Sequence, residues 1–230
     1  MKKIAVIPAR GGSKRIPKKN IRLFCDQPII SYSIKNAFES GVFDEVIVST
    51  DDEEIAEISK TYGAKIPFLR PKELSLDTTP TLPVIAHAIK ELHLNFDDLV
   101  CCIYPTAPLL KSQYLTSSLD KLLQSPEKLY IFSCVEFDFT PWRAFLINNE
   151  NEEISMLFEK HSLSRSQDLK KVYHDAGAFY WGKTGAFCDE KPIFHPHSIP
   201  FILPRMFVQD IDTLDDWEIA QIKYKLKNSK

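Results

Sequence analysis

Four short stretches of the chain are apolar without interruption, and longer amphipathic stretches separate them. The apolar runs are residues 4–7, 46–48, 99–103 and 129–132. A strand with one solvated face alternates apolar and polar residues, whereas a strand covered on both faces is apolar throughout. The runs therefore predict buried strands of a mostly parallel sheet, which places the chain in the α/β class.

The amphipathic stretches predict helices that alternate with these strands. Their expected ranges are 29–40, a helix beginning near Glu53, 80–93, 112–124 and 213–227. Gly41 follows the first at the usual C-terminal stop, and the polar run 49–54 supplies a cap and acidic residues for the second. From 137 to 173 the pattern loosens, with Trp142 and residues 144–147 as scattered apolar groups. We expect one domain, 1–230, with an insertion at 137–173.

Composition excludes several classes of protein. The chain is 44% hydrophobic and 26% charged, with a formal net charge of −2, so it has no overall bias toward nucleic acid or a membrane surface. Its apolar start ends at Pro8 and Arg10, which is too short for a signal peptide or a bilayer span, and we expect a cytoplasmic protein. The adjacent Cys101 and Cys102 would face opposite sides of a strand as reduced thiols.

The stretch from Ile7 to Asn20 leaves a predicted strand and enters a turn with two adjacent glycines and five cationic side chains. Gly11 and Gly12 let backbone N–H groups approach an anion, and the cations supply charge, so the stretch predicts a phosphate-binding loop. A solvated basic loop is the alternative. Neither the Walker A pattern nor the dinucleotide fingerprint occurs, which weakens kinase and dehydrogenase hypotheses.

Two acids, Asp210 and Asp212, stand two residues apart before the last predicted helix. On an extended segment both carboxylates share a face, and Mg²⁺ typically takes one or two carboxylates together with phosphate oxygens. The alternative is helix capping, because Thr213 fits an N-cap with Asp216 at the third helical position. Residues 69–75, 104–109 and 174–180 combine turn residues with polar donors, as expected of a ligand crevice at the ends of strands.

Taken together, these motifs resemble the CMP-sialic acid synthetase family, cytidylyltransferases that activate nonulosonic acids with CTP. The resemblance rests on residues 7–20, 49–51, 69–71, 104–109, the segment around Gly177, and 210–212. It implies a Rossmann-like three-layer α/β sandwich of the nucleotide-diphospho-sugar transferase type, dimeric through the insertion. It also implies CTP and a nonulosonic acid as substrates and Mg²⁺ as cofactor, with no nucleic acid or membrane partner.

The resemblance implies roles for individual residues. Arg10 and Lys19 would hold the triphosphate, and Asp210 and Asp212 the Mg²⁺; Arg10, Lys19 and Asp212 would be catalytic. The expected nucleotide-binding residues are Ala9, Arg10, Gly11, Gly12, Ser13, Lys14, Lys19, Asn20 and Arg70. The expected sugar-binding residues are Tyr104, Arg143, Arg165, His174, Asp175 and Tyr180. Apolar pocket walls are expected from Phe137, Phe139, Trp142, Phe179, Tyr180 and Trp181.

Within the family, residues 164–169 and 174–182 most resemble the members that activate pseudaminic acid. Tyr104 stands where members specific for N-acetylneuraminate tend to carry Gln, and His174–Asp175 where they tend to carry Arg-Pro. Pseudaminic acid is therefore the expected sugar, for surface or flagellin glycosylation. The alternatives are a synthetase of CMP-legionaminate, CMP-N-acetylneuraminate or CMP-Kdo, and, from another class, a non-catalytic nucleotide-binding regulator.

Overall fold

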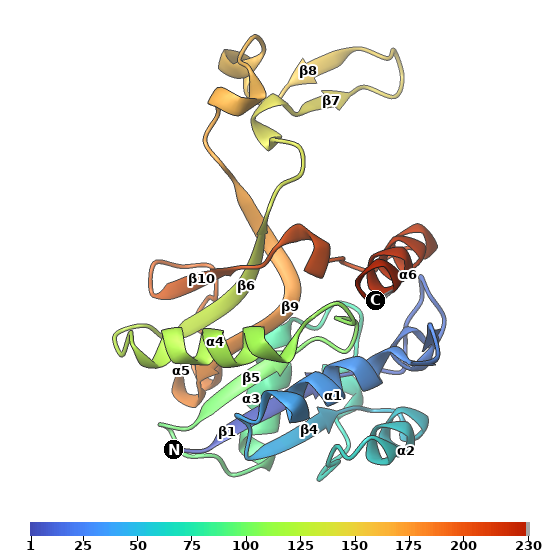
Figure 1. The fold of residues 1–230 in the computed structure, drawn as a ribbon, viewed down its shortest axis with the longest axis vertical. Helices are drawn as coiled ribbons and strands as arrows, with labels where there is room; N and C mark the ends of the chain where they lie inside the picture. Colours follow the sequence, from blue (N-terminus) through green and yellow to red (C-terminus); the bar gives the residue numbers. More distant parts are fainter. Residues whose placement is uncertain (229–230) are drawn as a thin grey trace.

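The computed structural model describes residues 1–228, in which a six-stranded sheet lies between two layers of helices (Figure 1). The strand order is β10-β6-β9-β5-β1-β4. β9 is antiparallel to both its neighbours, whereas all the other pairings in the sheet are parallel. The prediction of a mostly parallel sheet is thus confirmed. The strands are β1 (Lys3–Pro8), β4 (Glu45–Ser49), β5 (Leu99–Ile103), β6 (Tyr130–Glu136), β9 (Tyr173–Lys183) and β10 (Ser198–Ile202).

The helices follow the sequence prediction closely. They are α1 (Ile29–Ser40), α2 (Glu53–Thr61), α3 (Thr81–Glu91), α4 (Ser112–Leu123), α5 (Thr184–Cys188) and α6 (Leu214–Asn228). Gly41 ends α1 with a positive φ of 66°, and the Asp52 side chain caps α2 by accepting a hydrogen bond from the Ile55 N–H. The short helix α5 is the one that periodicity did not predict, because it spans little more than one turn.

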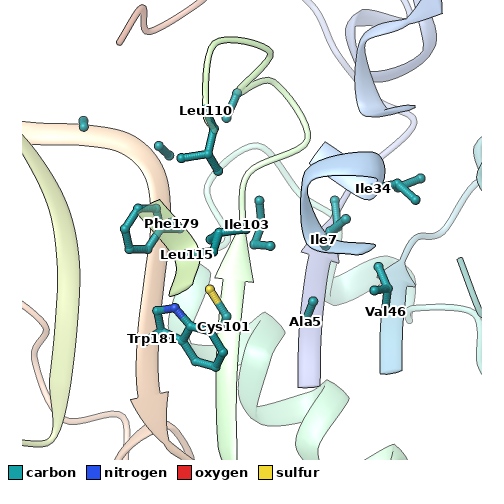
Figure 2. Packing of buried hydrophobic residues seen from close by; sticks show 14 of the residues in the cluster. Ala5, Ile7, Ile34, Val46, Cys101, Ile103, Leu110, Leu115, Phe179 and Trp181 are labelled. Carbon is teal, nitrogen blue, oxygen red and sulfur yellow. The ribbon is translucent and has the colours of Figure 1, made fainter. Parts of the chain in front are cut away.

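The core divides into two layers because successive residues of a strand face opposite sides of the sheet. Cys101 lies in the cluster beneath α1 and α4, and Cys102 in the cluster beneath α3 and α5, as predicted. Figure 2 shows the first layer, where Trp181 and Phe179 of β9 lie beside Cys101 and Ile103 of β5. The strand sequences do not alternate between apolar and polar residues, because helices cover both faces of the sheet.

A smaller apolar cluster joins the C-terminal helix to the beginning of the chain. The Trp217 ring of α6 meets Phe24 edge-on at 5.6 Å, and Ile16 and Ile211 are buried in the same cluster. Phe24 belongs to β2 (Leu23–Phe24), which pairs with β3 (Gln27–Pro28). This packing holds residues 210–212 against the loop that follows β1.

Residues 137–173 form an arm that projects away from the sheet at the ends of β6 and β9 (Figure 1). It contains a separate hairpin of β7 (Phe145–Ile147) and β8 (Ile154–Met156). Apolar side chains are exposed along it, among them Phe139 at 89% and Leu163 at 96%. Among residues 1–228, the structure has no helix with the length and apolar character needed to span a bilayer.

Candidate active site

The polar segments predicted to form a crevice meet at one edge of the sheet. β1, β4 and β5 run parallel, so the loops after Pro8, Ser49 and Ile103 leave from the same edge. β9 runs the opposite way, so its first residues, not its last, lie at that edge, where Asp175 pairs with Cys134 of β6. The carboxyl ends of parallel strands are the usual position of ligand sites in open α/β sheets.

A cleft of about 200 Å³ opens at this edge. Six of the predicted site residues line it: Arg10, Ser13, Lys19, Asn20, Arg70 and Tyr104. Asn20 is buried and donates a hydrogen bond of 2.9 Å from Nδ2 to the carbonyl of Arg10, which fixes the two ends of the loop to each other. The loop after β1 is therefore a wall of a cleft and not merely a solvated turn.

Asp77 occupies the basic end of this cleft. It forms an ion pair with Arg10, and its Oδ2 lies 2.5 Å from Nζ of Lys14. The hydrogen bonds from Lys14 and Arg10 lower the pKa of the Asp77 carboxyl. Sequence reasoning missed Asp77, because it lies in the loop before α3, 67 residues from Arg10, and no local pattern marks it.

The two glycines of the loop have different roles. The Gly11 N–H donates a hydrogen bond of 3.1 Å to Oδ1 of Asp51, and a Cβ at Gly11 would lie 2.5 Å from Oδ2 of Asp52. Gly11 is thus needed for close approach of the segment after β4, which is a different reason from the anion contact expected from the sequence. Gly12 has open space around it, with Nη1 of Arg10 the nearest atom at 3.8 Å.

Arg70 is a buried cation without full hydrogen bonding. Only 5% of it is exposed, and burial lowers its pKa, an effect that nearby Asp51 opposes. Nε donates to Ser75 Oγ at 3.0 Å, but Nη2 has no hydrogen-bond partner among the described residues and lies 3.7 Å from Asp51. A buried, unsatisfied guanidinium nitrogen at the cleft is suited to a polar ligand.

Lys19 links the loop to the acidic segment before α6. Its Nζ donates a hydrogen bond of 2.6 Å to the carbonyl of Ile211 and lies 3.6 Å from Oδ1 of Asp212. Burial lowers the pKa of Lys19, and the charge of Asp212 opposes this shift. Arg15 also pairs with Asp212, at 2.7 Å. The apolar cluster around Trp217 therefore brings two predicted groups of site residues together.

The capping interpretation of the acidic segment is confirmed for Thr213 and Asp216, and the metal interpretation of Asp210 and Asp212 stays a prediction. Thr213 and Asp216 form the capping interaction: the Asp216 N–H donates to Thr213 Oγ1 at 3.2 Å and the Thr213 N–H donates to Asp216 Oδ2 at 2.8 Å. Asp210 and Asp212 take no part in it through their side chains and line a second cleft of about 310 Å³. Burial, and then the charge of Asp212, raise the pKa of Asp210.

These two carboxylates fit a hard divalent cation, because both line one cleft and a cation would offset the burial and the repulsion from Asp212 that raise the Asp210 pKa. No group of three or more His, Cys, Asp or Glu side chains suited to a metal occurs among residues 1–228. A cation held here would therefore complete its coordination with substrate oxygens and water.

Of the predicted sugar-binding residues, Tyr104 lines the first cleft just after β5, and Asp175 and Tyr180 lie behind it on β9. Tyr104 shares a hydrogen bond of 2.7 Å with Thr81 Oγ1, and its ring meets that of Tyr180 edge-on at 5.5 Å. The Tyr180 hydroxyl donates to Asp175 Oδ2, and burial strongly raises the pKa of Tyr180, so the hydroxyl stays a donor. His174 precedes this pair and lines the second cleft with Asp210 and Asp212.

The structure does not bring Arg143 and Arg165 to these clefts. Both lie on the arm, both are exposed, and Arg165 pairs with Asp168 at 2.9 Å. Two of the predicted apolar walls are also misplaced: Phe179 and Trp181 are fully buried in the core beneath α1 and α4, because β9 lies in the middle of the sheet. The aromatic residues of a central strand cannot line an open pocket on that face.

A basic loop after the first strand, a buried arginine in the cleft and a pair of carboxylates before the last helix lie at one end of an α/β sheet. The comparisons with known proteins place this α/β chain in the nucleotidyltransferase class. The cytidylyltransferase family model matches residues 4–225, and the chain belongs to that family.

The chain is similar along its length to cytidylyltransferases of other bacteria. It is 51% identical over 230 residues to pseudaminic acid cytidylyltransferase of Campylobacter jejuni subsp. jejuni serotype O:2, covering 99% of this chain and 98% of the relative. It is 39% identical to the pseudaminic acid cytidylyltransferase and UDP-2,4-diacetamido-2,4,6-trideoxy-beta-L-altropyranose hydrolase of Helicobacter pylori, covering 96% of this chain and 42% of that protein. The fold matches CMP:2-keto-3-deoxy-manno-octonic acid synthetase complexed with CTP, with a TM-score of 0.73, 15% identity, and coverage of 99% and 100%.

Proposed function

We propose that this enzyme converts CTP and pseudaminic acid to CMP-pseudaminic acid and pyrophosphate. The observation that carries the proposal is the contact of Lys19 with Ile211 and Asp212, which sets a cation for phosphate beside carboxylates for a metal. The names of the relatives in Campylobacter and Helicobacter support the choice of nucleotide and sugar. In the cytoplasm, where we place the reaction, the five free cysteines would remain reduced.

The reaction is an in-line attack of the anomeric hydroxyl on the α-phosphorus of CTP. Such transfers depend on positioning and on neutralising charge, and they need no covalent nucleophile. Arg10 and Lys19 would offset the charge that develops on the leaving pyrophosphate. Asn20 and the unsatisfied Arg70 guanidinium would contact the nucleotide, together with Ala9, Gly12, Ser13 and Lys14. CTP would have to displace Asp77 from Arg10 and Lys14.

We propose Mg²⁺ as the cofactor and Asp210 and Asp212 as the residues that hold it. When bound, Mg²⁺ would neutralise phosphate charge and lower the pKa of the attacking hydroxyl. The chain's own contribution is the relative placement of the two carboxylates and Lys19, which the apolar packing of α6 onto the loop after β1 maintains.

We propose a homodimer joined through residues 137–173. The arm exposes Leu146, Ile154 and Leu163, and exposed apolar groups of this number usually mark an interface. Arg143 and Arg165 lie away from the clefts of their own chain, so they would reach a sugar carboxylate only in the cleft of the partner. Such an arrangement would allow one of these arginines to pair with the sugar carboxylate in the bidentate geometry that a guanidinium favours.

A coupled assay tests the central reaction. Pyrophosphate release from CTP should require both Mg²⁺ and added sugar acid, and mass spectrometry should find one CMP-sugar for each pyrophosphate. A protein that binds CTP but releases no pyrophosphate with any sugar acid would be a regulator, which is the rival from another class. If Kdo or legionaminic acid forms a product and pseudaminic acid does not, the cytidylyl transfer reaction is supported and the choice of pseudaminic acid as substrate is contradicted.

A further inference from the structure

Residues 49–51 follow β4 and carry part of the family resemblance, but the reaction described so far gives them no role. Their backbone contacts both the basic loop after β1 and the segment that carries Arg70. The Ser49 carbonyl accepts the Ala9 N–H at 2.9 Å. The Thr50 carbonyl accepts the Arg70 N–H at 2.7 Å. Ser49 and Thr50 are fully buried, so this segment is a fixed link between two parts of the cleft where we place the nucleotide.

Asp51 adds a side-chain contact to each of these parts. Its Oδ1 accepts the Gly11 N–H at 3.1 Å, and the same oxygen lies 3.7 Å from Nη2 of Arg70. The second distance is too long for a hydrogen bond, but an opposite charge this close stabilises a buried guanidinium. Asp51 therefore compensates the charge of Arg70 and leaves Nη2 available to a ligand, since this nitrogen has no hydrogen-bond partner among the described residues.

The hydrogen bond to Gly11 can hold the loop while a nucleotide is bound. Arg10 and Lys14 also tie the loop down through their ion pairs with Asp77, but CTP would displace those pairs. The hydrogen bond between Gly11 and Asp51 uses neither cation, and neither Gly11 nor Asp51 lines the cleft. This contact is therefore compatible with a bound nucleotide, and it restricts the loop before the nucleotide arrives.

We propose that Asp51 is a positioning residue for CTP, which holds the glycine turn of the basic loop through Gly11 and supplies the counter-charge for Arg70. This inference rests on the proposed function and deepens it. Asp51 acts through these two residues because it does not line the cleft itself. The two contributions are separable, since the hydrogen bond needs only an acceptor oxygen, whereas the counter-charge needs a carboxylate.

Asp51→Asn and Asp51→Ala separate the two contributions. Both remove the charge, but Asn keeps an amide oxygen that can accept the Gly11 N–H, whereas Ala has no acceptor. Because loss of this hydrogen bond frees the loop before CTP binds, the KM for CTP in Asp51→Ala should exceed that in Asp51→Asn by about fivefold or more. The kcat of the two variants at saturating CTP should agree within about twofold, since bound CTP orders the loop through Arg10 and Lys14.

Thermal melts without sugar acid measure the counter-charge, because no transfer takes place under those conditions. Asp51→Asn leaves the buried Arg70 guanidinium without its counter-charge, so the melting temperature of the free enzyme should fall by about 2–4 °C. The negative charge of CTP would take the place of Asp51 beside Arg70. Saturating CTP with Mg²⁺ should therefore raise the melting temperature of Asp51→Asn by about 2 °C or more beyond the rise in wild type.

Asp52→Asn is the matched control, because Asp52 is the next residue and caps α2 through the Ile55 N–H. Asn caps a helix about as well as Asp, so this change removes a neighbouring charge and keeps the local structure. The KM for CTP, the melting temperature and the rise caused by CTP should all stay at their wild-type values. The same changes in Asp52→Asn as in Asp51→Asn would overturn a specific role for Asp51.

These measurements distinguish failure of the inference from failure of the proposed function. Wild-type protein that gains no thermal stability from CTP and releases no pyrophosphate would contradict the proposed function, and the inference with it. In an active wild-type enzyme, equal KM values for Asp51→Ala and Asp51→Asn would overturn the role in holding the loop. A wild-type melting temperature in Asp51→Asn would overturn the counter-charge. A higher KM in Asp51→Ala than in Asp51→Asn, together with a larger CTP-induced rise in Asp51→Asn than in wild type, is the expected result.

Discussion

Lys19 Nζ donates a hydrogen bond of 2.6 Å to the carbonyl of Ile211, a residue 192 positions later in the chain. This contact joins the basic loop after β1 to the acidic segment, and it depends on the packing of Trp217 against Phe24. The site is therefore assembled by the C-terminal helix as much as by the loop after β1.

Replacing Lys19 with Ala should lower kcat by about 10² or more, the effect of removing one preorganised electrostatic donor. Lys18→Ala is the matched control, because Lys18 is exposed and pairs with Glu54. Steady-state pyrophosphate release measures both variants. A near-normal kcat in Lys19→Ala would show that Lys19 does not act on the transferring phosphates.

As pH rises, activity should be lost at a lower pH than it would be with a lysine of ordinary pKa at position 19. The reason is that burial lowers the pKa of Lys19, and its charged form is the one that would bind phosphate. Lys19→Arg should move this alkaline decline in kcat/KM for CTP to higher pH, since guanidinium stays protonated. A pH profile of the two enzymes decides the point. Superimposable alkaline limbs would show that another group titrates.

Asp77→Asn should lower the KM for CTP by about two- to fivefold. The carboxylate would compete with phosphate for Arg10 and Lys14, and because solvent-exposed ion pairs of this kind are weak, the expected gain is modest. Initial rates at varied CTP measure the effect. A higher KM would mean that Asp77 assists nucleotide binding and does not compete with it.

Asp212→Asn and Asp216→Ala should change different properties, the Mg²⁺ dependence of activity and the thermal stability respectively. Asp212→Asn should raise the Mg²⁺ concentration needed for half-maximal activity and leave the melting temperature nearly unchanged. Asp216→Ala removes a cap worth about 1 kcal/mol and should lower the melting temperature by about 2–4 °C. Mg²⁺ titrations and thermal melts provide both readouts. Unchanged Mg²⁺ dependence in Asp212→Asn would argue against metal binding there.

The effect of Asp216→Ala should also depend on pH. Burial opposes the charge of Asp216, but hydrogen bonds from Thr213 and the Asp212 backbone outweigh it and lower its pKa. A lowered carboxyl pKa contributes stability above the pKa of the unfolded chain, and that stability is lost as pH falls through the folded pKa. The gap in melting temperature should therefore narrow in acid.

Charging the arm should separate the proposed dimer. Leu146→Asp combined with Ile154→Asp places two charges on an exposed apolar hairpin, so light scattering at micromolar concentration should report a monomer, while wild type and Leu123→Asp remain dimers. Sugar KM should rise in the monomer if Arg143 and Arg165 serve the partner's cleft. A wild-type monomer would refute the dimer itself.

The sequence predicted the strands and helices whose patterns are local. The run at 99–103 is apolar because helices cover both faces of β5, and the helix at 29–40 ends at a glycine with positive φ. It did not predict that residues 174–180 lie within a strand running against its neighbours, since direction follows from chain connectivity and not from periodicity.

For the site, the sequence could single out the loop residues and the acidic pair as candidates that line clefts, because each forms a short, unusual pattern. It could not single out Asp77, since the role of Asp77 depends on a contact across 67 residues. For Gly11 the structure shows a reason that the sequence did not indicate, the close approach of Asp52, while the predicted anion contact stays a prediction. Phe179 and Trp181 were misplaced because burial on one face of a central strand requires knowledge of strand order.

The most direct test of the proposed reaction is a comparison of kcat/KM for pseudaminic, legionaminic and N-acetylneuraminic acids and Kdo, with CTP and Mg²⁺ held saturating. Pseudaminic acid should exceed each of the others by at least about tenfold, which corresponds to ~1.4 kcal/mol in transition-state binding. If another sugar acid equals or exceeds it, pseudaminic acid is not the preferred substrate. If no sugar acid causes pyrophosphate release, the proposed cytidylyltransferase reaction is contradicted.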